Sequence, residues 1–504
     1  MNTAPSARGS YSTATSRPVR VVATGAKGVV DAVNRTRVHA LHEDLTELSQ
    51  SVDDLLERTA DTARRLRLAS SKKPHVVVLG GSFAGLETAQ KLRLYARDRV
   101  DITVIDQKSY LLFIPGLLTS VLRDRDPAAT LHMPTEAALM RDDIRFLLGA
   151  VRAIDVERRR VHVEPAERAG APLRLVPYDY LVIALGNRLA YDAIPGFAEH
   201  GHALTDTYHA NRLRHFLHHR YRGGPVLIGS ARFHQGAALD WIPRSYAACE
   251  GPATETIFTL GEWLGGRMRH GSAPITFFTP GATFAAEIGA RGAKKLVSMA
   301  NDKGYRFLAN TVDIKRVTAD GVVFGDGREA EAELAILFPD WVPHTFLRGL
   351  GISDDQGFVI TDHRMRNPQY PEVLAVGDAA AASVPKLGYL AHLEADVAAW
   401  QIAVETGARA PREDALRFSP LVDCLAVVGA HMGLFVRTDV WYGGNTEVVK
   451  GGPVPALLKS LYERSFLMTA GHVPNWSITL ANLLGDHLSL NLLPAPTSSK
   501  SSSG

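Results

Sequence analysis

Cysteine is scarce in this sequence, with two residues, Cys249 and Cys424, among 504. Two thiols exclude a disulfide scaffold and leave either one functional pair or two inert buried thiols. No run of about 18 residues is free of charged and turn-forming residues, so no membrane-spanning helix is predicted. The first residues contain no apolar leader, which predicts no secretory signal and a cytoplasmic protein.

Neither sign of charge dominates, because 56 Lys and Arg oppose 53 Asp and Glu and leave a formal charge of +3. No dense basic stripe with interleaved aromatic residues occurs, so nucleic acid is not expected as a partner. The sequence predicts no metal site. The length suits two to four domains, and the 46% of hydrophobic residues is ordinary for a globular protein.

Residues 31–70 predict one long helix, followed by the linker "SSKKP". Apolar residues recur there at alternating steps of three and four, which is a heptad pattern. They are Val38, Leu41, Leu45, Leu48, Val52 and Leu55. Two interpretations stay open: the helix packs on its own domain, or it pairs with a second copy and makes a homodimer.

An α/β pattern begins at His75. "HVVVLGG" predicts a buried strand, "LETAQKLRLYAR" a helix and "VDITVID" a second strand, which is typical of a parallel sheet. "RLVPYDYLVIALG" (174–186) predicts a further strand, and "GGPVLIGS" (223–230) starts a second unit of the same kind.

The stretch "VVVLGGSFAGLETA" combines a strand, a Gly-rich turn and a helix, as in dinucleotide-binding folds. We expect Gly80 to make the tight turn and Gly85 to allow close packing of helix and strand. The helix amides would then face a pyrophosphate, and Asp106 stands where a ribose-binding acid belongs. Ser82 departs from the fingerprint, which prefers glycine there. The candidate cofactor residues of the turn are Gly80, Gly81, Ser82, Phe83, Ala84 and Gly85.

Two later segments resemble signatures of flavoproteins with two dinucleotide-binding domains. "YDYLVIALGNR" contributes Gly186, and "PEVLAVGDAAA" contributes Gly377 and Asp378. In that class the aspartate reaches the ribityl and phosphate region of FAD. The resemblance therefore implies FAD rather than NAD in the first domain.

A second Gly-rich turn is missing. Gly229 ends the strand of the second unit, but no further glycine follows at the right spacing. Arg232, Phe233 and His234 stand where the phosphates of a nicotinamide dinucleotide would lie. NADH is therefore not expected as the reductant at this position.

The segment "ACEGPATETIF" around Cys249 resembles the Cys-x-Gly-Pro-Ala segment of sulfide:quinone oxidoreductases. Cys424, in "DCLAVVGAHMGLFV", falls on the segment that carries the second catalytic cysteine of that family. The resemblance spans about residues 75 to 470, in the family's order. Its other segments are "APITFFTP", "AAEIG", "ILFPDW" and "VPKLGY".

This resemblance implies that Cys249 and Cys424 are a catalytic, sulfur-bridged pair attacked by hydrosulfide. Cys424 would be the cysteine nearer the flavin. Cys249 shortly precedes Pro252, so we expect the amino end of a helix to lower its thiol pKa. Glu250 puts a negative charge beside a site for an anion. The alternative for each cysteine is a buried, inert thiol.

Many members of the family carry a third cysteine, and some of them use it to bind FAD covalently. The corresponding region here reads "ALTDTYHA", which implies non-covalent FAD. Lys386, in "VPKLGY", would stabilise charge on the reduced flavin or on a quinone, or is a surface lysine in a turn.

The electron acceptor implied by the resemblance is a quinone, at a membrane surface. The stretch "PVPALLKSLYERSFLM" (453–468) predicts a helix that lies in the membrane interface or packs on the core, and 478–493 is a second candidate anchor. We expect a peripheral protein on the inner face of the cell membrane. Alternatives are a type II NADH:quinone oxidoreductase, a sulfide dehydrogenase subunit that reduces a cytochrome, and a redox scaffold.

The fold implied is α/β, with two Rossmann-like domains of the glutathione-reductase and type II NADH dehydrogenase kind. The predicted parts are disordered tails at 1–30 and 496–504, a helix and linker at 31–72, an FAD-binding domain at 73–190 and 335–410, a second dinucleotide-like domain at 191–334, and a C-terminal α+β region at 411–495.

Overall fold

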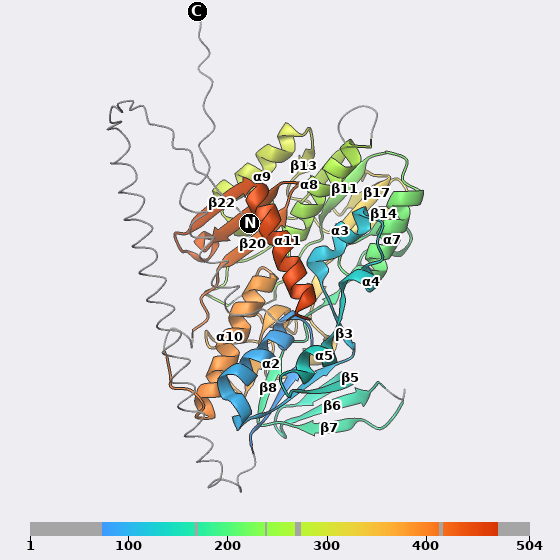
Figure 1. The fold of residues 1–504 in the computed structure, drawn as a ribbon. Helices are drawn as coiled ribbons and strands as arrows, with labels where there is room; N and C mark the ends of the chain where they lie inside the picture. The colour runs from blue at the N-terminus through green and yellow to red at the C-terminus, as the bar shows by residue number, and fades with distance from the viewer. Residues whose placement is uncertain (1–72, 167–169, 237–238, 268–273, 413–416, 472–504) are drawn as a thin grey trace, which may run out of the picture. The chain divides into compact units, whose positions relative to one another are not determined.

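The computed structural model describes residues 73–166, 170–236, 239–267, 274–412 and 417–471 (Figure 1). The predicted tails, the helix and linker at 31–72 and the candidate anchor at 478–493 lie outside the described residues. The boundaries predicted between domains stay predictions.

The first sheet has seven strands in the order β19-β8-β1-β2-β5-β6-β7. The strands are β1 His75–Leu79, β2 Asp101–Asp106, β5 Arg145–Asp155, β6 Arg160–Pro165, β7 Arg174–Pro177, β8 Tyr180–Ile183 and β19 Val373–Ala375. From β19 to β5 the pairing is parallel, with Val78 of β1 opposite Val104 and Val182. The apolar side chains of β1 from Val76 to Leu79 are fully buried, as a strand covered on both faces requires.

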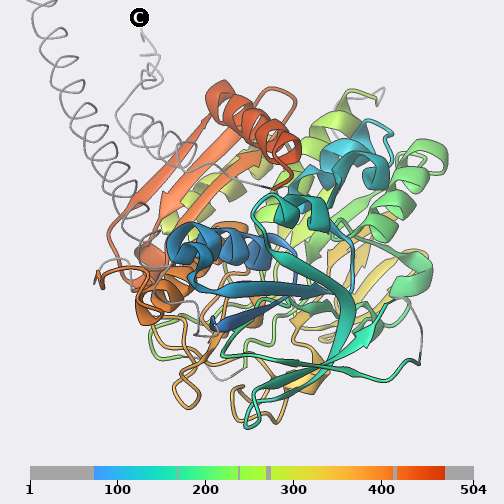
Figure 2. The same ribbon diagram turned by 60° about the horizontal axis from the view of Figure 1, so that its bottom comes forward.

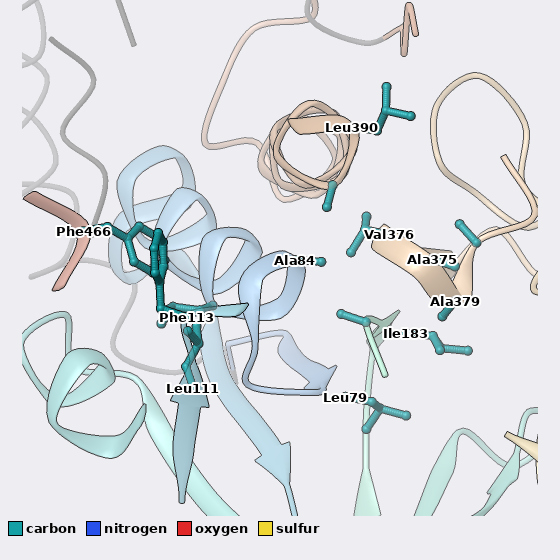
Figure 3. Packing of buried hydrophobic residues seen from close by; sticks show 14 of the residues in the cluster. Leu79, Ala84, Leu111, Phe113, Ile183, Ala375, Val376, Ala379, Leu390 and Phe466 are labelled. Atoms are coloured by element: carbon teal, nitrogen blue, oxygen red, sulfur yellow. The ribbon is translucent and has the colours of Figure 1, made fainter. Parts of the chain in front are cut away.

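Two helices pack against each other beside this sheet, α2 Phe83–Ala96 and α10 Gly388–Glu405. Figure 2 shows α2, in blue, beside the first sheet. Both helices are rich in buried alanine, including Ala89 and Ala395, and these small side chains let the helix axes approach closely. The strand β19 reaches this sheet from far along the chain, so segments distant in sequence meet around α2 (Figure 3).

The second sheet is parallel throughout, in the order β10-β17-β11-β12-β13. Its strands are β10 Gly201–His202, β11 Val226–Ser230, β12 Ile275–Phe278, β13 Arg306–Leu308 and β17 Leu334–Phe338. Its helices are α7 Thr207–His219, α8 Gly251–Gly265 and α9 Ala290–Asp302. One parallel sheet and one sheet that is parallel from β19 to β5, both covered by helices, confirm the predicted α/β class.

The C-terminal part is an antiparallel sheet with one helix. The strands β20 Val422–Val427, β21 Gly433–Thr438 and β22 Glu447–Gly452 follow one another, and α11 Pro453–Met468 packs on β20 and β21. This agrees with the predicted α+β character of the region. Within the described ranges, no helix has both the length and the apolar character needed to cross a bilayer.

Shorter elements complete the unit. They are β3 Tyr110–Leu112, α3 Leu117–Leu122, α4 Pro127–Leu131, β4 His132–Pro134, α5 Thr135–Met140, β9 Arg188–Leu189, α6 Phe197–His200, β14 Ile314–Thr318, β15 Gly321–Phe324, β16 Glu329–Glu331 and β18 Trp341–Val342, with the short 3₁₀ helices η4 Ala286–Ile288, η6 Gly377–Ala379 and η8 Val440–Tyr442.

Candidate active site

The Gly-rich turn joins β1 to α2 with the geometry that a dinucleotide site needs. Gly80 has φ +103°, and a Cβ there would lie 2.2 Å from the carbonyl oxygen of Ala184. A Cβ on Gly85 would lie 1.9 Å from the carbonyl oxygen of Gly80. Both glycines are therefore required by the backbone itself. Ser82 is exposed at the amino end of α2 and makes no side-chain capping bond, which leaves this end available to a phosphate group.

We expect Gly85→Ala to destabilise the fold by about 1–3 kcal/mol and to lower the bound FAD, because helix and strand must move apart. Thermal unfolding and the flavin-to-protein absorbance ratio measure the two effects. Gly388→Ala is the matched control, since a Cβ at this first residue of α10 meets nothing within 4 Å. Unchanged stability and flavin content in Gly85→Ala would contradict the expected role of the close contact.

Asp106 ends β2 and faces the same turn. Its Oδ2 accepts a hydrogen bond from the Gly81 amide at 2.7 Å, and its Oδ1 accepts one from the Lys108 amide at 2.8 Å. Gly186 lies in the turn after β8 with φ +62°, and a Cβ there would meet nothing within 4 Å. Strands β1, β2 and β8 are neighbours, so these residues gather at one edge of the sheet.

Gly377 and Asp378 lie against the start of α2. A Cβ on Gly377 would lie 2.7 Å from the Cβ of Ala84, so this second segment closes over the first turn. The Gly377 amide donates a 2.6 Å hydrogen bond to the carboxylate of Glu394, which is fully buried in α10. Burial raises the pKa of Glu394 to about 8.

Lys386 lies next to this group and is only 3% exposed, so the interpretation as a surface lysine is wrong. Its Nζ donates to the backbone oxygens of Asp378 at 2.8 Å and Ala380 at 3.1 Å. Burial lowers its pKa to about 8, against the opposing charges of Asp378 and Glu394. The Lys386 amide also donates to the carbonyl oxygen of Ala248 at 2.8 Å, which ties the cofactor segments to the residue beside Cys249.

Cys249 is buried just before α8, where the Gly251 backbone N–H faces its sulfur. The expected lowering of the thiol pKa is wrong. Burial raises the pKa of Cys249 well above its ordinary value, and the charge of Glu287 raises it further, while the Gly251 amide only partly opposes them. At neutral pH the free thiol is therefore protonated.

Cys424 is half-buried in β20, and its charge acts on the thiol of Cys249. Burial raises the pKa of Cys424 to about 12, with a further contribution from Glu255 that the charge of Lys459 opposes. Glu255 of α8 and Lys459 of α11 form a buried ion pair, and Glu255 also accepts the Val427 amide at 3.0 Å. These contacts fasten α8, β20 and α11 around the two cysteines.

Glu250 does not carry the full negative charge that the sequence led us to expect. Glu250 is 3% exposed and lies against the buried Glu287. Burial and the charge of Glu287 raise the pKa of Glu250 to about 8. The carboxyl is therefore largely protonated at neutral pH, and the objection to an anionic substrate weakens.

The chain after β11 does not form a nucleotide-binding turn. The described residues between Ser230 and Gly251 contain no helix, so no helix amino end follows the strand. Phe233 packs instead in a small core with Ile242, Ala248 and Phe358. This agrees with the missing second fingerprint.

An aromatic cluster, which the sequence did not reveal, covers the Gly-rich turn. Phe466 of α11 stacks on Phe83 with ring centroids 5.4 Å apart. Phe466 also packs on Phe113 at 5.1 Å, as Figure 3 shows. The side of α11 away from this cluster carries exposed apolar residues, including Leu457 and Leu461. The predicted helix thus has one packed face and one open apolar face.

The sequence between residues 74 and 221 matches the family model described as pyridine nucleotide-disulphide oxidoreductase. The sulfide-quinone reductase of Aquifex aeolicus is 26% identical over 78% of this chain and 90% of its own length. The demethylphylloquinone reductase of Synechocystis is 24% identical over 70% of this chain and 85% of its own length. Among solved structures, the sulfide:quinone oxidoreductase of Aquifex aeolicus has a TM-score of 0.68 at 22% identity, covering 81% of this chain and 95% of that one.

These relatives and this fold are those of flavin oxidoreductases, so the chain is a flavin-dependent oxidoreductase. Within this class, the predicted resemblance to sulfide:quinone oxidoreductase is confirmed in sequence and in fold. FAD is the cofactor of this class and is confirmed as the predicted one. The residues described above fit it: an open helix end, a tight glycine turn and the Gly377–Asp378 segment.

The sequence did not single out the carboxyls of Glu287, Glu394 and Glu255, which the structure places among the predicted site residues. Glu287 lies in the quoted segment "AAEIG", and Glu255 lies in the segment around Cys249. Glu394 gave a clearer signal, because it stands in an alanine-rich helix.

Proposed function

We propose that this enzyme oxidises sulfide to sulfane sulfur through the pair Cys249 and Cys424, and passes the electrons through FAD to a membrane quinone. The observation that carries this is that the charge of Cys424, in β20, acts on the buried thiol of Cys249 just before α8, where the Lys386 amide donates to the neighbouring Ala248 carbonyl. The names of both curated relatives support a quinone acceptor.

In this proposal the bridged cysteine pair is the electrophile and hydrosulfide is the nucleophile. Hydrosulfide bonds to the Cys249 sulfur, and the bond from that sulfur to Cys424 breaks. Cys249 then carries a persulfide and Cys424 a thiolate. FAD, when bound, accepts two electrons and returns them to a second acceptor. Lys459 holds Glu255 beside Cys424 and partly offsets the negative charge around its sulfur.

The absence of a thiol other than Cys249 and Cys424 supports non-covalent FAD, since neither lies at the family's covalent position. Denaturation followed by filtration should release the flavin completely. Flavin that stays with the unfolded chain would contradict this part of the proposal.

Anaerobic titration of the purified protein tests the electron donor. We expect sulfide to bleach the flavin absorbance and NADH to leave it unchanged, because the described residues directly after β11 offer no helix end to a second dinucleotide. Bleaching by NADH and not by sulfide would favour a type II NADH:quinone oxidoreductase. Rates with a short-chain quinone and with cytochrome c then distinguish the proposed acceptor from that of a sulfide dehydrogenase subunit.

The open face of α11 supports a peripheral membrane position for the protein. Leu457, Leu461 and Met468 are 59%, 53% and 83% exposed on one helix, which is an unusual density of large apolar side chains for a water-facing helix. The packed face of the same helix reaches the aromatic cluster beside the Gly-rich turn, so a helix docked on a membrane would also contact the cofactor-binding part of the protein.

We expect Leu457→Glu with Leu461→Glu to weaken sedimentation with lipid vesicles at least about tenfold, because each buried leucine contributes about 1.5–3 kcal/mol. Turnover with a short-chain soluble quinone should stay near the wild-type value. Leu94→Glu, at an exposed leucine of α2, is the control. Equal vesicle binding by all three proteins would show that α11 does not dock to the membrane.

A further inference from the structure

Two buried carboxyls beside Cys249 have no part in the function proposed so far. Glu250 precedes the first residue of α8, and its Oε2 accepts the Ala285 amide at 2.6 Å. Its Oε1 is buried without a hydrogen-bond partner. Glu287, in η4, accepts the backbone N–H of Glu250 at 3.3 Å. The two carboxyls therefore sit together at the amino end of the helix, on the side of the cysteine.

No lysine or arginine of the described residues forms an ion pair with Glu250 or Glu287. Two neighbouring carboxylates in a buried site repel each other and are poorly solvated, so ionisation of both is disfavoured near neutral pH. The pair then keeps one proton, and the loss of this proton belongs to the pair and not to one residue. The partnerless Oε1 of Glu250 is the atom available to hold or give up this proton.

The surroundings of Cys249 make this proton relevant to sulfur chemistry. The charged or titratable groups that act most strongly on its thiol are Glu287, Cys424 of β20 and Asp378 of η6, and Tyr442 of η8 is affected in turn by Cys249. None of these groups is a cation. A thiolate released at Cys249 would be buried among acidic groups, and such a thiolate is a poor leaving group.

We propose that Glu250 and Glu287 share one proton and deliver it to the Cys249 sulfur when that sulfur is released from its persulfide. A second hydrosulfide bonds to the outer sulfur of the persulfide, and the bond from the outer sulfur to Cys249 breaks. The products are hydrogen disulfide and the Cys249 thiolate, with no change in electron count. The thiolate then takes the shared proton, which leaves both carboxyls ionised and Cys249 as a thiol. This step rests on the proposed function.

Infrared spectroscopy tests the shared proton without any turnover. In the wild type, the carbonyl band of a protonated carboxylic acid should titrate near pH 8. Glu250→Gln and Glu287→Gln should each shift this titration to lower pH, because the remaining carboxyl loses its like-charged neighbour. The double variant should lack that part of the band. Glu394 titrates in the same range but is present in all four proteins, so differences between them isolate the pair.

Rapid mixing of the persulfidated enzyme with hydrosulfide tests the delivery step. At a fixed hydrosulfide concentration, the wild-type release rate should fall as the pH rises through about 8, where the pair loses its proton. In the double variant the rate at neutral pH should be about a hundredfold lower and should lack this pH dependence. Each single variant should lose the limb near pH 8.

Glu262→Gln is the matched control, because Glu262 also lies on α8 and accepts a backbone amide, that of Ala430, at 3.0 Å. Its pH profile should equal that of the wild type. If only one of Glu250→Gln and Glu287→Gln moves the infrared titration, the proton is not shared. If thermal stability falls but the release profile keeps its limb, the pair is structural and the proposal is overturned. If sulfide does not reduce the wild type at all, the delivery step fails together with the proposed function, while the infrared result still decides whether the proton is shared.

Discussion

Replacing Cys249 or Cys424 with serine is expected to slow reduction of the flavin by sulfide about a thousandfold or more. Hydrosulfide needs a sulfur–sulfur bond to attack, and a serine oxygen cannot form one. Either substitution alone removes the bridge, so the double variant should be no slower than the single ones, as expected for residues that act as one unit. Anaerobic stopped-flow absorbance measures the three rates.

The control for these variants is whether the protein still binds FAD and folds normally, because the cysteines are not expected to stabilise the cofactor site. Flavin content and thermal unfolding should stay near wild type, because serine is close in size to cysteine at a buried position. A variant that keeps the wild-type rate of reduction by sulfide would make its cysteine a buried hydrophobe. Loss of flavin from both variants would instead point to a structural role.

The first dinucleotide site could be predicted from the sequence because its requirements are local. The positive φ of Gly80 and the contact of Gly85 with the Gly80 carbonyl both act within six residues of chain, whereas the contact of Gly80 with Ala184 joins distant segments. The strand β1 was predictable for a similar reason, since a short apolar run buried on both faces is typical of a central parallel strand.

The electrostatics of the site could not be predicted in the same way. The amino end of α8 was visible in the sequence through Pro252, and by itself it lowers a nearby thiol pKa. The opposite result for Cys249 arises from burial and from Glu287, which η4 brings in from another part of the chain. The interpretation of Lys386 as a surface lysine was wrong for the same reason. The rings of Phe358 and Phe233, which come from other parts of the chain, lie under its ammonium group.

The buried Lys386 is expected to make the stability of the protein depend strongly on pH. Its pKa is about 8 in the folded protein, below the ordinary value of 10.5, because burial disfavours the charged form. Between these two values the unfolded chain binds a proton that the folded protein does not. The free energy of unfolding therefore rises as the pH increases through this window. Below about pH 8 both states are protonated, and the full cost of burying the charge is present.

We expect the free energy of unfolding of the wild type to gain about 2–3 kcal/mol over that of Lys386→Met between about pH 7 and pH 10. Methionine has a similar length and no proton to lose, so other groups that titrate in this range largely cancel in the difference. Chemical unfolding of the two proteins at several pH values measures it. Lys294→Met, on an exposed position of α9, should show no such change relative to the wild type. A constant difference between wild type and Lys386→Met across this range would mean that the buried lysine keeps its ordinary pKa, because the carbonyl oxygens of Asp378 and Ala380 would then have offset the cost of burial.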